Sequence, residues 1–449
     1  MTATVEPIEV TRPAAASLRG HWIDDWRPED PTFWAGGGAR IAKRNLIFSI
    51  FSEHIGFSVW SLWSVMVLFL GPQYGFDPAQ KFLLTAVPTL VGAGLRIPYT
   101  FAVARFGGRN WTIISASLLL VPAILAAILI EPGVSFTTCL ILAATAGVGG
   151  GNFASSMANI NAFFPNRHKG WALGINAGGG NIGVAAVQLI GLFVLAVFGA
   201  GRPGIVAGIY IPLIVLATVA SAIWMDNLSQ ARNEKRGMRD AVRESHTWVM
   251  SLLYIGTFGS FIGFGFAFGQ VLQVQFADRF DTPIKAAYLT FLGPLLGSLI
   301  RPVGGALADR LGGARVTFVN FIAMAAGAST VLVAAQQRSL PLYLAGFTSL
   351  FILSGLGNGS TYKMIPAIFK AKYAGDEHQA RRISGAVIGI AGAIGAVGGV
   401  LVNLAFRQSF LTYRDADAAY LGFIGFYALC VLVTWVVYLR PAARRTIAV

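Results

Sequence analysis

Long apolar runs separated by short polar turns make up most of the chain from residue 46 onward. Each run has about 20 residues or more, the length that an α-helix needs to cross a bilayer core roughly 30 Å thick. The pattern therefore predicts an all-α polytopic membrane protein with twelve transmembrane helices, at about 46–70, 80–104, 110–130, 134–164, 169–199, 203–225, 247–277, 283–307, 315–336, 340–370, 382–408 and 416–439.

The longest charged stretch between two apolar runs, residues 226–246, divides six predicted helices from six. Its charges alternate in sign, which is typical of a solvated connection, so we interpret it as a cytoplasmic linker. The expected organisation is an N-terminal tail, a six-helix bundle, the linker, a second six-helix bundle and a C-terminal tail, with bounds 1–45, 46–225, 226–246, 247–440 and 441–449.

The two halves repeat one motif, LRIPYTFAVARFGGRNWT at 95–112 and IRPVGGALADRLGGARVT at 300–317. Each copy begins with an arginine inside an apolar helix, Arg96 or Arg301, and leaves the helix through a glycine-rich basic turn, which we expect to latch helix ends. Two six-helix halves in the same order are parallel repeats related by an axis along the membrane normal, an arrangement typical of transporters.

Composition agrees with a membrane protein, since 55% of residues are hydrophobic, 12% are charged and the mean hydropathy is +0.64. The net charge of +14 does not indicate nucleic-acid binding, because the basic residues lie in short turns rather than in one patch. They are enriched in alternate turns and both tails, and residues 1–45 lack a signal-peptide core. We therefore expect a multi-pass protein of the cell inner membrane, embedded in the lipid bilayer, with both termini cytoplasmic.

No enzyme or metal site is indicated. The five histidines show no ligand spacing, and Cys139 and Cys430 both lie in apolar runs, where we expect small buried side chains. There is no nucleophile constellation and no output domain of a sensor. The sequence thus predicts a transporter that needs no cofactor and no metal, although fold alone does not identify the substrate.

The two matched arginines are the strongest chemical signal. A guanidinium at bilayer depth costs roughly 2.5–3.5 kcal/mol on insertion scales and stays protonated, so it needs a negative partner. Only Glu53 is clearly acidic within the predicted helices, and one carboxylate cannot neutralise both Arg96 and Arg301. Pseudo-twofold symmetry would bring both arginines to a central cavity, where a small anion is their natural complement.

Glycines and amides gather in two further pairs of matched helices. Each glycine costs about 1 kcal/mol relative to alanine in a helix, but it permits close helix packing and exposes backbone polar groups. Packing alone remains an alternative explanation for each single glycine. The cluster, with its amides at membrane depth, favours a ligand site that includes Asn152, Asn181, Gly178, Gly389 and, in the segment GLGNGSTYKM, Ser360.

Aromatic residues accompany this cluster. Tyr254 and Phe258 lie four residues apart on one face of the helix 247–277, and Phe153 follows Asn152. Such rings suit a flat, weakly hydrated anion, although an aromatic stripe is also common in an ordinary core.

Almost end to end, the chain resembles the nitrate/nitrite porter family (NarK-type) of the major facilitator superfamily. The resemblance rests on DWRPEDPTFW, LRIPYTF, GGGNFASSMANINAFFP, ALGINAGGGNIG, LLYIGTFGSFIGF, IRPVGGALADRLGG, GLGNGST and AIGAVGG. It implies the major facilitator fold and transport of nitrate and nitrite by alternating access. It also implies an anion clamp of Arg96 and Arg301, with Phe153, Tyr254 and Phe258 packed around the planar anion and Asn181, Gly389 and Gly392 nearby.

Titratable residues distinguish this chain from the best-known exchangers of that family, which have apolar residues near Glu53 and His54 and an amide near Lys363. These three side chains can bind and release protons in step with the anion. We therefore expect nitrate/proton symport, with Lys363 and Glu53 as first candidates for the coupling residue and His54 as third. The alternatives are nitrate/nitrite antiport, or transport of another small anion, and we expect a monomer.

Overall fold

A computed structural model describes residues 20–230 and 235–440. In this part of the chain twelve helical spans are long and apolar enough to cross a membrane, the number that hydropathy predicts. The first half comprises α1 (Pro31–Phe33), η1 (Trp34–Gly38), α2 (Ala39–Trp60), α3 (Leu62–Phe69), η2 (Pro72–Tyr74), α4 (Pro78–Phe106), α5 (Gly108–Leu118), α6 (Leu120–Leu129), α7 (Phe136–Ala146), α8 (Val148–Phe163), α9 (Asn166–Phe198) and α10 (Gly204–Trp224).

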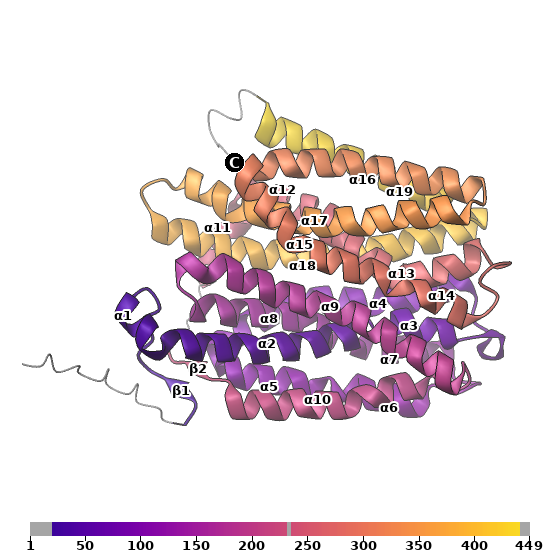
Figure 1. The fold of residues 1–449 in the computed structure, drawn as a ribbon, viewed down its shortest axis with the longest axis horizontal. Helices are drawn as coiled ribbons and strands as arrows, with labels where there is room; N and C mark the ends of the chain where they lie inside the picture. The colour runs from indigo at the N-terminus through magenta and orange to yellow at the C-terminus, as the bar shows by residue number, and fades with distance from the viewer. Residues whose placement is uncertain (1–19, 231–234, 441–449) are drawn as a thin grey trace, which may run out of the picture.

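The second half comprises α11 (Lys235–Arg243), α12 (Ser245–Tyr254), η3 (Ile255–Gly259), α13 (Ser260–Gln275), α14 (Pro283–Thr290), α15 (Leu292–Leu311), α16 (Gly313–Gln336), α17 (Leu340–Lys372), α18 (Glu377–Tyr413), α19 (Asp417–Thr434) and η4 (Trp435–Leu439). The two halves lie side by side with their long helices roughly parallel (Figure 1). The end of the bundle that carries α1 and α11, at the left of Figure 1, is called the terminal face below.

The first span begins earlier than hydropathy predicts. Helical structure starts at Pro31, because the Asp30 carboxylate accepts hydrogen bonds from the backbone N–H groups of Thr32 and Phe33. It continues through η1 into α2, so residues 31–45 of the predicted tail belong to the first span. Hydropathy does not predict this part of the helix, because the basic residues of ARIAKRN at the start of α2 lower the mean hydropathy there. Residues 1–19 and the predicted C-terminal tail, 441–449, lie outside the described residues.

The two halves meet closely at the end of the bundle opposite the terminal face. The Thr85 hydroxyl of α4 donates to the Asn403 amide oxygen of α18 (2.7 Å), and both side chains are fully buried. One turn earlier, Phe82 stacks on Phe406 and Phe410, with ring centroids 5.7 and 5.6 Å apart. These contacts join α4 to α18 and close this end of the interface between the halves.

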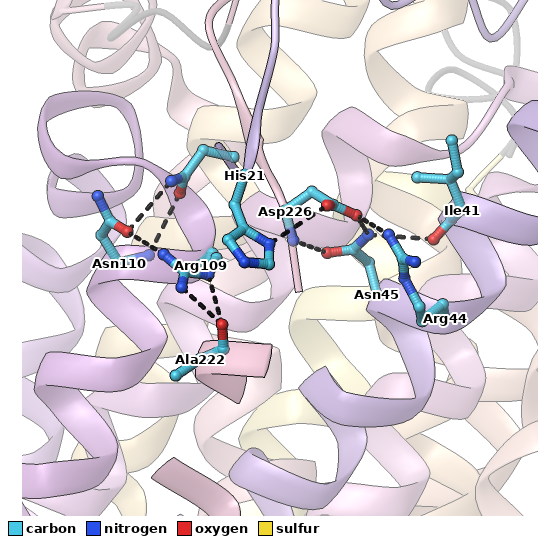
Figure 2. Close-up of polar contacts among 9 residues, drawn as sticks. His21, Ile41, Arg44, Asn45, Arg109, Asn110, Ala222 and Asp226 are labelled. Carbon is cyan, nitrogen blue, oxygen red and sulfur yellow. Dashed lines mark hydrogen bonds and ion pairs between the residues drawn. The ribbon is translucent and has the colours of Figure 1, made fainter. Parts of the chain in front are cut away.

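The start of the linker is buried, which corrects the prediction of a solvated connection. Trp22–Ile23 (β1) pairs in parallel with Asn227–Leu228 (β2). Asp226 is 3% exposed, and its carboxylate accepts hydrogen bonds from Arg44 (2.5 Å) and Asn45 (2.8 Å) of α2 (Figure 2). Alternation of charge could not reveal this, because the partners of Asp226 lie in the predicted tail.

The glycine-rich basic turn of the first half lies in the same region (Figure 2). Arg109 donates two hydrogen bonds to the carbonyl oxygen of Ala222 near the end of α10, at 3.0 and 2.5 Å, and Asn227 donates to Asn110 (3.1 Å). This turn therefore latches the end of a neighbouring helix, the role expected for it.

Replacing Asp226 by asparagine should destabilise the folded protein by about 1.5–3 kcal/mol, because hydrogen bonds to a buried charged group are lost. The measurement is thermal unfolding of the detergent-solubilised protein. Asp278→Asn is the matched control, since Asp278 is exposed and its ion-pair partner among the described residues is its neighbour Arg279 (3.6 Å). Equal melting temperatures for the Asp226 variant and the control would contradict this account of the buried carboxylate.

Candidate substrate-binding site

Arg96 of α4 is buried (1% exposed) and connects the two halves. Its Nε donates to the carbonyl oxygen of Gly150 on α8 (3.2 Å), and its Nη1 donates to the carbonyl oxygen of Gly392 on α18 (2.6 Å). A helix interior rarely offers carbonyl oxygens to a side chain, but glycine leaves the backbone accessible. Two of the three guanidinium nitrogens are thereby fixed, which sets the direction of the third.

Aromatic rings enclose the same guanidinium. Its Cζ atom lies 4.7 Å from the ring centroid of Phe153 and 4.8 Å from that of Phe258, and these two rings are themselves stacked 6.1 Å apart. Trp60 of α2 lies at 5.5 Å. Cation–π attraction is strongest where water is excluded, so the rings hold a permanent charge in a dry environment.

Arg301 of α15 occupies the equivalent place in the second half and is 5% exposed. Its Nη2 donates to the Tyr254 hydroxyl (3.1 Å), and the Tyr254 ring stacks on Phe258 at 5.2 Å with 9° between the planes. Since Phe258 also contacts Arg96, a continuous path of contacts runs from one arginine to the other. The structure thus brings together Arg96, Arg301, Phe153, Tyr254 and Phe258, as the sequence predicts.

Neither arginine has a carboxylate partner within 4 Å among the described residues, whose ion pairs all lie elsewhere. In the same part of the chain, Nη2 of Arg96 and Nη1 of Arg301 are buried and have no hydrogen-bond partner. A buried charge normally requires both a counter-charge and satisfied donors. Two free donors on two cations without an ion-pair partner in the described chain form an arrangement that a bound anion would complete.

Two adjoining cavities lie at the cluster. A chamber of about 70 Å³ is lined by Arg96, Phe153, Gly389 and Gly392, and a vestibule of about 1030 Å³ is lined by Arg301. Five residues belong to both walls: Asn161, Leu173, Tyr362, Gly385 and Ile388.

The vestibule lies at the terminal face. It is lined by residues from the end of α8, the start of α9, the ends of α15 and α17, and the start of α18. At this end of the bundle the backbone N–H of Asn166 donates to Glu29 of the N-terminal segment (3.0 Å). The contacts between Phe82 and α18 close the other end, so the site is reached from the terminal face.

The glycines of the glycine-rich helices differ in whether a side chain would fit at their position. On α8 and α17 the glycines permit close packing, because a Cβ on Gly149 would collide with the carbonyl oxygen of Gly56, and one on Gly355 with that of Gly297. On α9 and α18 both situations occur: a Cβ on Gly180 would collide with Oε1 of Glu53, whereas other glycines leave space. A Cβ on Gly178 would meet nothing within 4 Å, and one on Gly392 would lie 3.7 Å from Nη1 of Arg96.

The amino-acid sequence of this chain is similar to sequences of known transporters. Residues 46–403 match the family model described as Major Facilitator Superfamily. The nitrate/nitrite transporter NarU of Escherichia coli (strain K12) is 38% identical, with 93% of this chain and 96% of that protein aligned. The probable nitrate/nitrite antiporter NarK2 of Thermus thermophilus is 34% identical, with 96% and 99% aligned.

This chain belongs to the nitrate/nitrite porter family of the Major Facilitator Superfamily. The resemblance seen in the motifs is therefore confirmed, as is the expectation of a multi-pass membrane transporter rather than an enzyme. A solved structure of the xylose transporter XylE from E. coli, in a partially occluded inward-open conformation, has a TM-score of 0.67 and 12% identity, covering 88% of this chain and 97% of that one. At that identity the likeness shows the fold alone, and it confirms the major facilitator fold.

Not every predicted binding residue of this porter-family chain lines a cavity. Asn152 and Asn181 are buried, and among the described residues neither amide group has a hydrogen-bond partner. Neither residue lines the chamber or the vestibule. Ser360 lies on the other side of α17 and forms a hydrogen bond with the Thr317 hydroxyl (2.9 Å), so its predicted contact with substrate is not supported.

Glu53 is buried in the middle of α2. Its Oε2 atom accepts hydrogen bonds from the Ser156 hydroxyl of α8 and from the Asn176 amide of α9 (2.6 Å). Its Oε1 atom has no partner in the described chain. The carboxyl group lies within electrostatic range of Arg96 and Arg301, so its charge and that of the site influence each other.

The other two titratable candidates are placed differently. The Nδ1 atom of His54 lies 3.1 Å from the carbonyl oxygen of Gly179, so this imidazole is tied to the backbone of α9. Lys363 lines the vestibule, with 45% of its side chain exposed, and pairs with Asp309 at 3.0 Å. Among the three, Glu53 alone combines full burial with an electrostatic influence on the arginines.

Sequence reasoning missed Tyr362 and Trp60. Tyr362 lines both cavities, and the Cζ atom of Arg301 lies 5.6 Å from its ring. The available signal was position: Tyr362 directly precedes Lys363 and lies three residues after Gly359, another vestibule residue. Trp60 gave no signal, because an aromatic residue in an apolar helix is ordinary.

Proposed function

We propose that this protein transports nitrate and nitrite across the membrane by alternating access. The observation that carries the proposal is the pair of buried guanidinium groups, one from each half, that have no carboxylate partner among the described residues. Movement of the two halves about this site would expose the anion to each side of the membrane in turn. The predicted division into two six-helix bundles around a linker is part of this proposal.

The size of the chamber and the charge of the groups around it favour a small planar anion as the substrate. A water molecule occupies about 30 Å³ of the liquid, so a chamber of about 70 Å³ matches an occupant of a few heavy atoms. Flat rings of Phe153 and Phe258 beside planar guanidinium groups suit a trigonal anion with one negative charge. NarU and NarK2, the relatives compared above, are named for nitrate and nitrite.

Orientation follows from the distribution of basic residues. The positive-inside rule predicts that both termini are cytoplasmic, which would make the terminal face the cytoplasmic face. The vestibule at that face would then represent the inward-open state of a monomeric transporter in the cell inner membrane.

Proton symport is the coupling that Glu53 supports best. The positive charge of Arg96 and Arg301 favours an ionised Glu53, and a bound anion offsets that charge. Anion and proton binding therefore favour each other, and this coupling is reciprocal. Lys363 is a weaker candidate than the sequence suggested, because it is half-exposed and paired with Asp309.

Nitrate/nitrite antiport is the second candidate, and the name of the relative NarK2 favours it. Arginine keeps its proton near neutral pH, so a clamp of arginines alone would exchange one anion for another.

Uptake of labelled nitrate by proteoliposomes tests these proposals. We expect an inward-directed proton gradient, with no nitrite inside, to accelerate nitrate uptake. Absence of acceleration together with an absolute need for internal nitrite would show antiport instead. Unlabelled nitrate, nitrite, chlorate and an organic anion are then added as competitors. Competition by the organic anion that is as strong as competition by unlabelled nitrate would contradict the proposed substrate class.

A further inference from the structure

Tyr362 lies where the chamber and the vestibule meet. It belongs to the walls of both cavities, so any anion that passes from the vestibule to Arg96 passes its side chain. Its ring lies 5.6 Å from the Cζ atom of Arg301 and 6.0 Å from the ring of Tyr254. Tyr362 is therefore part of the arginine and aromatic cluster, on the second half of the protein.

The hydroxyl group of Tyr362 is buried and has no hydrogen-bond partner among the described residues. It lies within electrostatic range of Arg96, Arg301 and Glu53. A buried hydroxyl without a partner is costly unless an acceptor is supplied. Among the described residues there are thus three free donors: Nη2 of Arg96, a chamber residue; Nη1 of Arg301, a vestibule residue; and the hydroxyl of Tyr362, which lines both cavities.

We propose that the Tyr362 hydroxyl is a third hydrogen-bond donor to the transported anion and gives the site a preference for nitrate over nitrite. Nitrate has three equivalent oxygens in one plane, one for each donor. Nitrite has two oxygens, so one donor would lose its best acceptor. A site that buries an unpaired donor discriminates against the ligand that leaves it unpaired. This inference rests on the proposed function and specifies its selectivity.

Substitution of Tyr362 by phenylalanine removes the hydroxyl and keeps the ring. Binding of sodium nitrate and of sodium nitrite to the purified full-length protein is measured by titration calorimetry. We expect the Kd for nitrate to rise about tenfold and that for nitrite to change by less than about threefold, since one hydrogen bond to a charged ligand is lost only for nitrate. Tyr74→Phe is the matched control, because Tyr74 also buries a hydroxyl without a partner in the described chain but lines neither cavity.

The outcomes separate this inference from the function on which it rests. Unchanged nitrate affinity in the Tyr362→Phe variant, or an equal loss for both anions, overturns the selectivity role. The native protein provides a second measurement that does not depend on the folding of the variant: nitrite binding as tightly as nitrate, or more tightly, also overturns it. Failure of the native protein to bind either anion would instead refute the proposed function.

Discussion

Nitrate uptake should fall about 100-fold or more when Arg96 or Arg301 is replaced by lysine, although each variant retains its positive charge. Arg96 reaches the carbonyl oxygens of Gly150 and Gly392 with two different nitrogens and keeps a third free for the anion, whereas lysine carries all its donors on one nitrogen. Lysine also lacks the planar guanidinium group that lies beside Phe153 and Phe258. Loss of a buried hydrogen-bonded charge contact costs about 2–5 kcal/mol, and each 1.4 kcal/mol is tenfold.

The measurement is the initial rate of labelled nitrate uptake into proteoliposomes, normalised to the amount of reconstituted protein. Arg279→Lys is the matched control, since Arg279 is exposed and pairs with its neighbour Asp278. Melting temperatures of the purified variants separate loss of transport from loss of folding. Near-normal uptake by both the Arg96 and the Arg301 variant would refute a clamp that depends on guanidinium geometry.

Replacing Glu53 by glutamine should abolish the acceleration of nitrate uptake by an inward proton gradient. Site-to-site coupling free energies correspond to about 5–150-fold, so we expect gradient-driven uptake to fall about tenfold or more. Glutamine is chosen because space is limited: a Cβ on Gly180 would collide with Oε1 of Glu53, so only a side chain of the same shape is suitable. An amide still accepts the hydrogen bonds from Ser156 and Asn176.

Exchange of external for internal nitrate needs no net proton movement, so the Glu53→Gln variant should retain it. This retention distinguishes a lost proton site from a damaged binding site. Glu131→Gln serves as the control, because Glu131 lies in an exposed turn. Lys363→Gln, measured in parallel, tests the other predicted coupling residue. If the proton gradient still accelerates uptake by the Glu53 variant but not by the Lys363 variant, proton coupling would be assigned to Lys363 in the vestibule instead of Glu53.

Access from one side only has a direct structural basis. Thr85 and Asn403 form a buried hydrogen bond between the halves at the closed end, and Phe82 stacks on α18 beside it. At the terminal face the halves are separated by the vestibule. Opening the closed end would require these contacts to break. The hydrogen bond from Arg96 to Gly392 also joins the halves, so the state of the site and the position of the halves are mechanically linked.

The sequence by itself determined the helices, the repeat and the arginine pair. Length and hydropathy suffice for the helices, because a span must satisfy its backbone hydrogen bonds internally and be apolar over about 20 residues. The repeat placed Arg96 and Arg301 at equivalent positions, and a scarcity of acidic residues within the spans implied an anion. These properties are local or follow from counting, so they need no knowledge of how the helices pack.

Only the tertiary structure decided which face of each helix meets the site. Ser360 and Tyr362 are two residues apart on α17 and point about 200° apart around its axis, so one contacts α16 and the other borders both cavities. Hydropathy cannot separate these faces, because helices in a membrane are apolar towards both lipid and protein. Likewise, Gly149 packs against α2 whereas Gly178 leaves open space, although both lie in similar glycine runs. Rotation of each helix is set by side-chain contacts with its neighbours, and these contacts join residues far apart in the chain.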